Sequence, residues 1–76
     1  MPELPVLSGQ DVIRGLERLG FEVVRQRGSH VILRKQLTDG NRGCVVPLHR
    51  EVASGTLRSV LRQAGVSPEE FIAVLR

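Results

Sequence analysis

One histidine in a basic, glycine-containing segment is the residue with the clearest chemical potential. His30 directly follows the pair Gly28-Ser29. Four basic residues flank this triplet: Arg25, Arg27, Arg34 and Lys35. An imidazole gains and loses a proton near neutral pH, so it can serve as a general acid or a general base. Guanidinium and ammonium groups bind phosphate, and the segment therefore suggests phosphodiester chemistry.

Cleavage of RNA is the phosphodiester reaction that requires the fewest catalytic groups from a protein. The ribose 2′-hydroxyl is the nucleophile, a base removes its proton, and positive groups stabilise the charge that develops. Gly28 lets a phosphate approach the backbone, and the N–H groups of Gly28-Ser29 can donate to it. The alternative is that His30 is an ordinary surface histidine in a tight turn, since titratable side chains also occur far from any site.

The other residues with possible chemistry give weaker signals. His49 and Arg50 follow Pro47-Leu48, and we expect them to bind RNA or support the structure, because nothing nearby in the sequence orients the imidazole for catalysis. Cys44 has the neighbours of a small buried hydrophobic residue. No pair of histidine or cysteine has the spacing of a zinc site, so we expect neither a metal nor a cofactor.

Composition and charge narrow the classes of function. The chain has 76 residues with 41% hydrophobic and 25% charged residues, which predicts one globular domain over residues 1–76. Ten of the eleven basic residues are arginines, and from Arg14 to Arg62 ten basic residues stand against four acidic ones. Such a balance favours a polyanionic partner, although a solvated arginine-rich surface would give the same count. With only two phenylalanines and no tyrosine or tryptophan, base stacking is not the expected mode of recognition.

The sequence also indicates where the protein resides. Its longest apolar runs are too short to cross a bilayer, and its N-terminus lacks the basic start and apolar stretch of a signal peptide. The single Cys44 excludes an internal disulfide. We therefore expect a soluble, cytoplasmic protein without membrane association.

Helical signals lie at both ends of the chain and frame a segment rich in β-formers. Ser8 has the spacing of an N-cap to Asp11 and predicts a helix over residues 9–19, which ends at Gly20. A second helix is expected from Ser54 to about residue 64. A capping box beginning at Ser67, with proline at the first helical position, predicts a last short helix.

Three runs between these helices have the composition of strands, at residues 21–27, 30–36 and 43–49. The pair Gly28-Ser29 and the turn cluster 38–41 separate them, which favours an antiparallel meander. Pro47 cannot donate to a sheet and marks an edge or the end of the third strand. If Val31 and Leu33 face the core, alternation places His30, Ile32 and Arg34 on the opposite face.

The element order predicts an α+β fold, α-β-β-β-α with an extra short C-terminal helix. Two amphipathic helices can cover one face of a three-stranded antiparallel sheet. The other face then stays free to bind a ligand.

Several short motifs occur together in an order that resembles a known family. They are Leu19-Gly20-Phe21, Arg25-Gln26-Arg27-Gly28-Ser29-His30, Val46-Pro47-Leu48-His49, Gly55-Thr56-Leu57, Gln63-Ala64-Gly65 and Pro68-Glu69-Glu70-Phe71. In this combination the chain resembles the HicA (YcfA-like) toxins of toxin–antitoxin systems, which are small mRNA interferases. The resemblance implies a fold like that of double-stranded-RNA-binding domains. It further implies ribosome-independent, metal-free cleavage of mRNA, with the family's catalytic histidine falling on His30, and a HicB-type antitoxin that blocks the active site.

Two hypotheses of function follow, with a third compatible with the first. The preferred one is an endoribonuclease toxin for single-stranded RNA in which His30 is the general acid or base. Its RNA-binding residues would be Arg25, Arg27, Gly28, Ser29, Arg34, Lys35, His49 and Arg50. The alternative is a non-catalytic RNA-binding module of the same fold. The third is a surface for a protein partner, made of exposed apolar residues on the uncovered face: Val24, Ile32, and Val45 or Val46.

Overall fold

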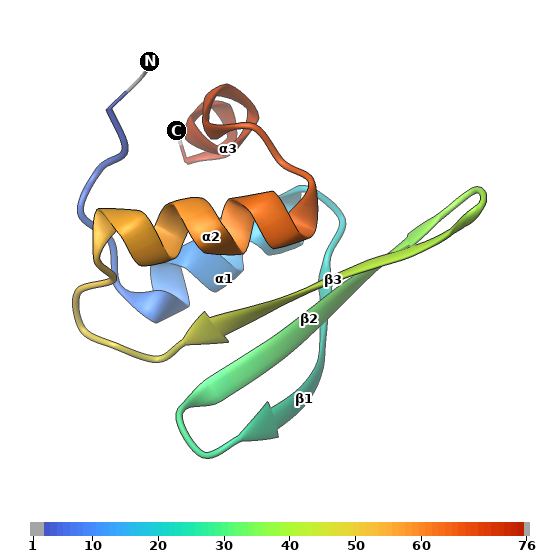
Figure 1. Cartoon of the computed structure of the whole chain (residues 1–76), viewed down its shortest axis with the longest axis horizontal. Coiled ribbons are helices and arrows are strands. Elements are labelled where there is room, and N and C mark those ends of the chain that lie inside the picture. The colour runs from blue at the N-terminus through green and yellow to red at the C-terminus, as the bar shows by residue number, and fades with distance from the viewer. Residues whose placement is uncertain (1–2, 76) are drawn as a thin grey trace.

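The computed structural model describes residues 3–75 and contains three helices and one sheet in the predicted order (Figure 1). The elements are α1 (Gly9–Arg18), β1 (Glu22–Arg27), β2 (His30–Leu37), β3 (Gly40–Pro47), α2 (Ser54–Ala64) and α3 (Pro68–Val74). The expected α+β fold with a three-stranded antiparallel sheet and an extra C-terminal helix is thereby confirmed. No helix within residues 3–75 has the length and apolar character needed to span a membrane.

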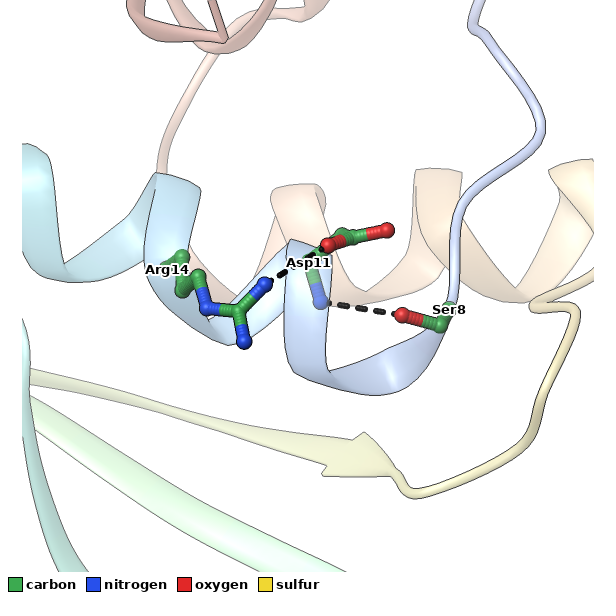
Figure 2. Close-up of polar contacts among 3 residues, drawn as sticks. All are labelled: Ser8, Asp11 and Arg14. Atoms are coloured by element: carbon green, nitrogen blue, oxygen red, sulfur yellow. Dashed lines mark hydrogen bonds and ion pairs between the residues drawn. The ribbon is translucent and has the colours of Figure 1, made fainter.

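Local side-chain contacts explain where α1 begins. The backbone N–H of Asp11 donates to the hydroxyl of Ser8, with 3.2 Å between N and Oγ (Figure 2). The Asp11 carboxylate lies in the first turn, where it complements the positive end of the helix dipole. The same carboxylate pairs with the Arg14 guanidinium at 3.1 Å. The predicted N-cap is therefore correct.

The strands form a meander in the order β1-β2-β3 with two-residue connections. Gly28-Ser29 joins β1 to β2, and Gly28 has a φ of +58°, which the first position of a type II′ hairpin turn requires. Thr38-Asp39 joins β2 to β3. The register of β2 and β3 is continuous from His30 opposite Pro47 to Leu37 opposite Gly40.

The predicted limits of the third strand are wrong at both ends. The sequence predicts a strand over residues 43–49, whereas β3 begins at Gly40 and ends at Pro47. Gly40 is of a residue type common in turns, yet it lies in the ladder opposite Leu37. Its φ is +150°, a backbone conformation that favours glycine. Pro47 ends the strand, as expected of a residue without an N–H group.

The helices cover one face of the sheet, and the hydrophobic core lies between the two layers. Alternate residues of β2 and β3 point into it and are buried: Val31, Leu33, Cys44 and Val46. Leu16 of α1 and Leu57 of α2 meet them from the other side. Figure 1 shows α3 on the far side of α1 and α2 from the sheet, and α3 contacts these helices.

Strand β1 receives no cover from the helices, since every one of its residues is exposed. Its pairing with β2 shifts between Val23 and Arg25, so Val24 is the extra residue of a β-bulge. The residue before the strand, Phe21, is buried in the core as expected. The chain thus enters the core at Phe21 and then passes along an open edge.

The capping box of α3 has a titratable member. The Ser67 backbone N–H donates to Glu70 Oε1 at 3.0 Å, and the Glu70 N–H donates to Ser67 Oγ at 3.1 Å. The hydrogen bond from the Ser67 backbone, followed by that from its side chain, lowers the pKa of Glu70. A lowered folded-state pKa gives stability that is present above the unfolded pKa and is lost as the pH falls through the folded pKa.

We therefore expect the free energy of unfolding to fall more steeply in the wild type than in Glu70→Gln as the pH drops below the ordinary glutamate range. Glutamine can still accept from Ser67 but does not titrate. Urea denaturation at a series of pH values measures the difference. Glu69→Gln removes a carboxylate from the same turn outside the capping box and should retain the wild-type slope. Parallel curves for the wild type and Glu70→Gln would contradict the assignment.

Candidate functional site

The face of the sheet that carries no helix, here called the open face, holds the predicted catalytic histidine. The register places three rows of side chains across this face. Arg27, His30 and Pro47 form the first row; Arg25, Ile32 and Val45 the second; Glu22, Arg34 and Gly43 the third. His30 and Arg34 are exposed while Val31 and Leu33 are buried, so the predicted alternation of β2 is confirmed.

His30 lies at the start of β2, directly after the hairpin turn. The turn is held from within, because Gln26 Nε2 donates to the carbonyl oxygen of Gly28 at 3.0 Å. Arg27 is the cross-strand neighbour of His30. A cation and an imidazole thus lie side by side at an exposed turn, with open space around Gly28.

The loop after β3 packs against this turn and brings the second histidine to the same end of the sheet. The Leu48 N–H donates to the Ser29 carbonyl at 2.7 Å, and the Gly9 N–H donates to the His49 carbonyl at 2.9 Å. Further along, the Val52 N–H donates to the Leu7 carbonyl at 2.7 Å. Backbone hydrogen bonds therefore hold the loop to both the β1–β2 turn and the start of α1.

A hollow of about 240 Å³ lies where this loop meets α1. Its lining consists of Ser8, Gln10, Leu48, His49 and Arg50. The sequence indicated His49 and Arg50, but the contribution of Ser8 and Gln10 arises only from long-range backbone pairing. Their hydroxyl and amide groups add donors and acceptors beside His49 and Arg50.

The arginines of the open face are available for an anion. Within residues 3–75, the ion pair between Asp11 and Arg14 is the one present, so no carboxylate there neutralises Arg25, Arg27 or Arg34. Unpaired guanidinium groups on a surface attract and bind phosphate. The three arginines that the sequence groups with His30 therefore lie on the same face of the sheet as His30.

Lys35 lies apart from this group. It pairs with Arg42 in the register and so projects to the helix-covered side of the sheet. Its ammonium group lies 5.9 Å from the centre of the Phe21 ring, and its side chain runs beside Gly20. The structure therefore does not bring Lys35 together with His30.

The apolar residues of the open face form a short band beside the arginines. Val24 and Val45 are 47% and 38% exposed, and Ile32, the cross-strand partner of Val45, is half-buried. Val46, which the sequence offered as the alternative to Val45 in this apolar surface, is buried in the core. An apolar band flanked by cations suits a ligand or partner with both apolar and anionic parts.

The remaining candidate residues have structural roles. Burial raises the pKa of the Cys44 thiol to about 11, so it stays protonated and unreactive at neutral pH. Over residues 3–75, no three histidine, cysteine or acidic side chains lie close enough together to hold a metal ion. The chemistry that this face can offer from its own residues is proton transfer and the binding of anions.

Gly9 fixes the position of the loop that carries His49. A methyl group at this position would lie 2.1 Å from the Pro47 carbonyl oxygen. We expect Gly9→Ala to destabilise the protein by about 1–3 kcal/mol through overpacking and to weaken RNA binding, because the 47–49 segment must move away. Urea denaturation and RNA titration measure both effects.

Gly55→Ala is the matched control for this substitution. Nothing lies within 4 Å of the added methyl group in α2, and alanine is the better helix former. The control should leave RNA binding intact and stability equal or higher. A Gly9→Ala protein as stable as the control would show that α1 does not constrain the loop.

Comparisons with known proteins identify a family for the chain. The family described as HicA toxin of bacterial toxin-antitoxin matches residues 9–66, which is well over half of the chain. The matched range includes α1, the whole sheet, the loop with His49 and α2. A search of curated proteins found no match.

Proposed function

The chain belongs to the HicA toxin family of bacterial toxin–antitoxin systems, and we propose that it acts in the cytoplasm as an endoribonuclease that cleaves single-stranded mRNA. The proposal rests on one observation above all. His30 stands exposed on the open face at a Gly28-Ser29 turn, beside Arg27 and near two further unpaired arginines. This arrangement supplies a group that transfers protons and cations that hold a phosphate.

In the proposed mechanism, His30 accepts the proton of a ribose 2′-hydroxyl. The 2′-oxygen then attacks the adjacent phosphorus, and the bond from phosphorus to the 5′-oxygen breaks. The leaving oxygen takes a proton from solvent, so the products carry a 2′,3′-cyclic phosphate and a 5′-hydroxyl. Arg25 and Arg27 neutralise the charge that develops on the phosphate oxygens.

The remaining site residues bind the strand. The backbone N–H groups of Gly28 and Ser29 line the turn, where a phosphate can approach closely. His49 and Arg50 contact the strand on the side of the loop, and Arg34 contacts it further along β2. No step of this scheme requires a metal ion, and we propose that the reaction proceeds without one.

Incubation of the purified protein with ribosome-free, single-stranded RNA tests the proposal. We expect cleavage that persists in the presence of a chelator and yields 5′-hydroxyl ends. An RNA with a single ribose among deoxyribonucleotides should be cut only at the ribose. Absence of cleavage, or cleavage at a deoxyribonucleotide, would reject the mechanism.

The alternative function is RNA binding without cleavage. The unpaired arginines of the open face favour it equally, because phosphate binding needs no imidazole. Its expected result is RNA affinity that falls steeply with salt, with no product formed and no dependence on His30.

The toxin family implies an antitoxin partner, and the apolar band offers it a place to bind. We propose that a HicB-type antitoxin covers the open face by contacting Val24, Ile32 and Val45. Occupation of this face would exclude RNA from His30. Co-purification of the two proteins should therefore abolish RNA cleavage.

A further inference from the structure

A second hollow lies at the β1 edge of the sheet, at the end of β2 away from His30, where residues of the open face meet Gly20 and Lys35 from the helix-covered side. It has a volume of about 230 Å³, and Gly20, Glu22, Val24, Arg34, Lys35 and Gln36 line it. Four residues separate His30 from Arg34, which at 3.4 Å per residue is about 14 Å along the strand. A nucleic acid strand that passes His30 along β2 therefore reaches this hollow at a nucleotide beyond the scissile phosphate.

Glu22 and Arg34 face this space together. They are cross-strand partners in the β1–β2 register, which places their Cβ atoms about 5 Å apart on one face. Both side chains are exposed. Neither forms an ion pair with any residue in the range 3–75, including each other. A carboxylate and a guanidinium group therefore remain free for the same ligand.

The combination of these two groups fits one nucleobase. A carboxylate presents two acceptors, and guanine is the base whose Watson–Crick edge presents two adjacent donors, N1–H and N2–H. A guanidinium group donates well to the O6 and N7 atoms of guanine, of which O6 lies next to N1–H and N7 lies beyond it. Adenine, cytosine and uracil each present an acceptor beside their donor and leave one carboxylate oxygen without a partner.

The other lining residues complete the description of the hollow. Val24 is 47% exposed and provides an apolar surface for the base. The Gln36 Nε2 donates to the Gly40 carbonyl at 3.2 Å, so the Gln36 amide is anchored and its Oε1 atom is an acceptor. The acceptor of Gln36 adds to the preference for a base with several donors.

We propose that this hollow binds a guanine base of the RNA, with Glu22 on N1–H and N2–H and Arg34 on O6 and N7. The inference deepens the proposed function and rests on the binding of RNA to the open face. It makes Glu22 a specificity-determining residue that takes no part in the cleavage step.

Binding measurements on the His30→Ala protein test the proposal without cleavage. The probes are short oligouridine RNAs that carry either one guanine or one adenine at a central position, compared at one salt concentration. We expect the guanine probe to bind about tenfold more tightly, which is the discrimination typical of a bidentate base contact. Equal affinity for the two probes overturns the proposal.

Glu22→Gln in the same background identifies the residue responsible. Glutamine keeps the shape of glutamate but replaces one acceptor with a donor, so the preference for guanine should disappear. Glu69→Gln makes the same change on α3, on the other side of the molecule from the open face, and should keep the preference. A guanine preference that survives Glu22→Gln overturns the proposal.

Cleavage mapping separates this inference from the proposed function. With His30 intact, the sites cut in a long RNA should share a guanine at one fixed position, and Glu22→Gln should lose that bias while still cutting. Cleavage without any such bias overturns the inference and leaves the ribonuclease standing. A guanine preference in binding without cleavage overturns the ribonuclease and supports the inference.

Discussion

Replacement of His30 by alanine is expected to lower the rate constant of RNA cleavage about 10²- to 10⁴-fold, which is the usual contribution of a positioned general acid or base. Because His30 is exposed on the open face, its removal leaves the core intact. The cations that hold the strand also remain in place. Single-turnover kinetics at saturating protein measures the effect, with circular dichroism to verify the fold.

His49→Ala is the matched control for this experiment. The imidazole of His49 lies at the same end of the sheet but in the loop after β3, where we assign it to binding. This variant should bind RNA more weakly and retain the cleavage rate at saturation. If His30→Ala cleaves as fast as the wild type, or if His49→Ala loses the activity instead, His30 is not the catalyst.

The largest expected effect on stability is that of Phe71→Ala, at about 3–5 kcal/mol. The Phe71 ring is fully buried, and it lies directly on Gly15, where an added methyl group would be 2.7 Å from the ring. Removal of the ring leaves a cavity between α3 and α1. The loss is a large part of the 5–15 kcal/mol that stabilises a typical domain. Urea denaturation gives the free energy directly.

Ile72→Ala in the same helix provides the comparison. Ile72 is only half-buried, so the loss should be clearly smaller. Equal losses for the two variants would contradict the assignment of Phe71 as the main core contact of α3. The family match ends at Val66, before α3, so this measurement shows whether the segment outside the match is needed for folding.

The helix limits could be predicted because their signals are local. Ser8 and Ser67 cap the helices that follow them through contacts within three residues. Alternation within β2 also predicted which residues face the core, since a strand has a fixed period of two. These features need no knowledge of the rest of the chain.

The features of the sheet that could not be predicted depend on contacts between distant segments. The start of β3 was misplaced because Gly40 and Asn41 have turn-like types, whereas cross-strand pairing keeps them in the ladder. The bulge at Val24 has no sequence signal of its own. Its effect is to bring Val24 and Glu22 to a hollow that sequence analysis did not find.

In the candidate site, too, features set by local sequence could be predicted, and features set by long-range contacts could not. Lys35 was grouped with His30 for its charge, although the alternation that placed Arg34 on the open face places Lys35 on the other. His49 approaches the turn before His30 through backbone bonds between residues about 20 and 40 positions apart, as in Leu48 to Ser29 and Gly9 to His49. The roles of His30 and of the RNA-binding residues stay predictions.

The two outer strands differ in their capacity to extend the sheet. The Val45 N–H, which points away from β2, donates to Gln63 Oε1 of α2 at 3.1 Å. Pro47, two residues on and oriented alike, has no N–H to offer. The edge of β3 is therefore blocked to an incoming strand near Val45 and Pro47, while every residue of β1 is exposed. Addition of a further strand is therefore favoured at the edge of β1 over the C-terminal part of β3.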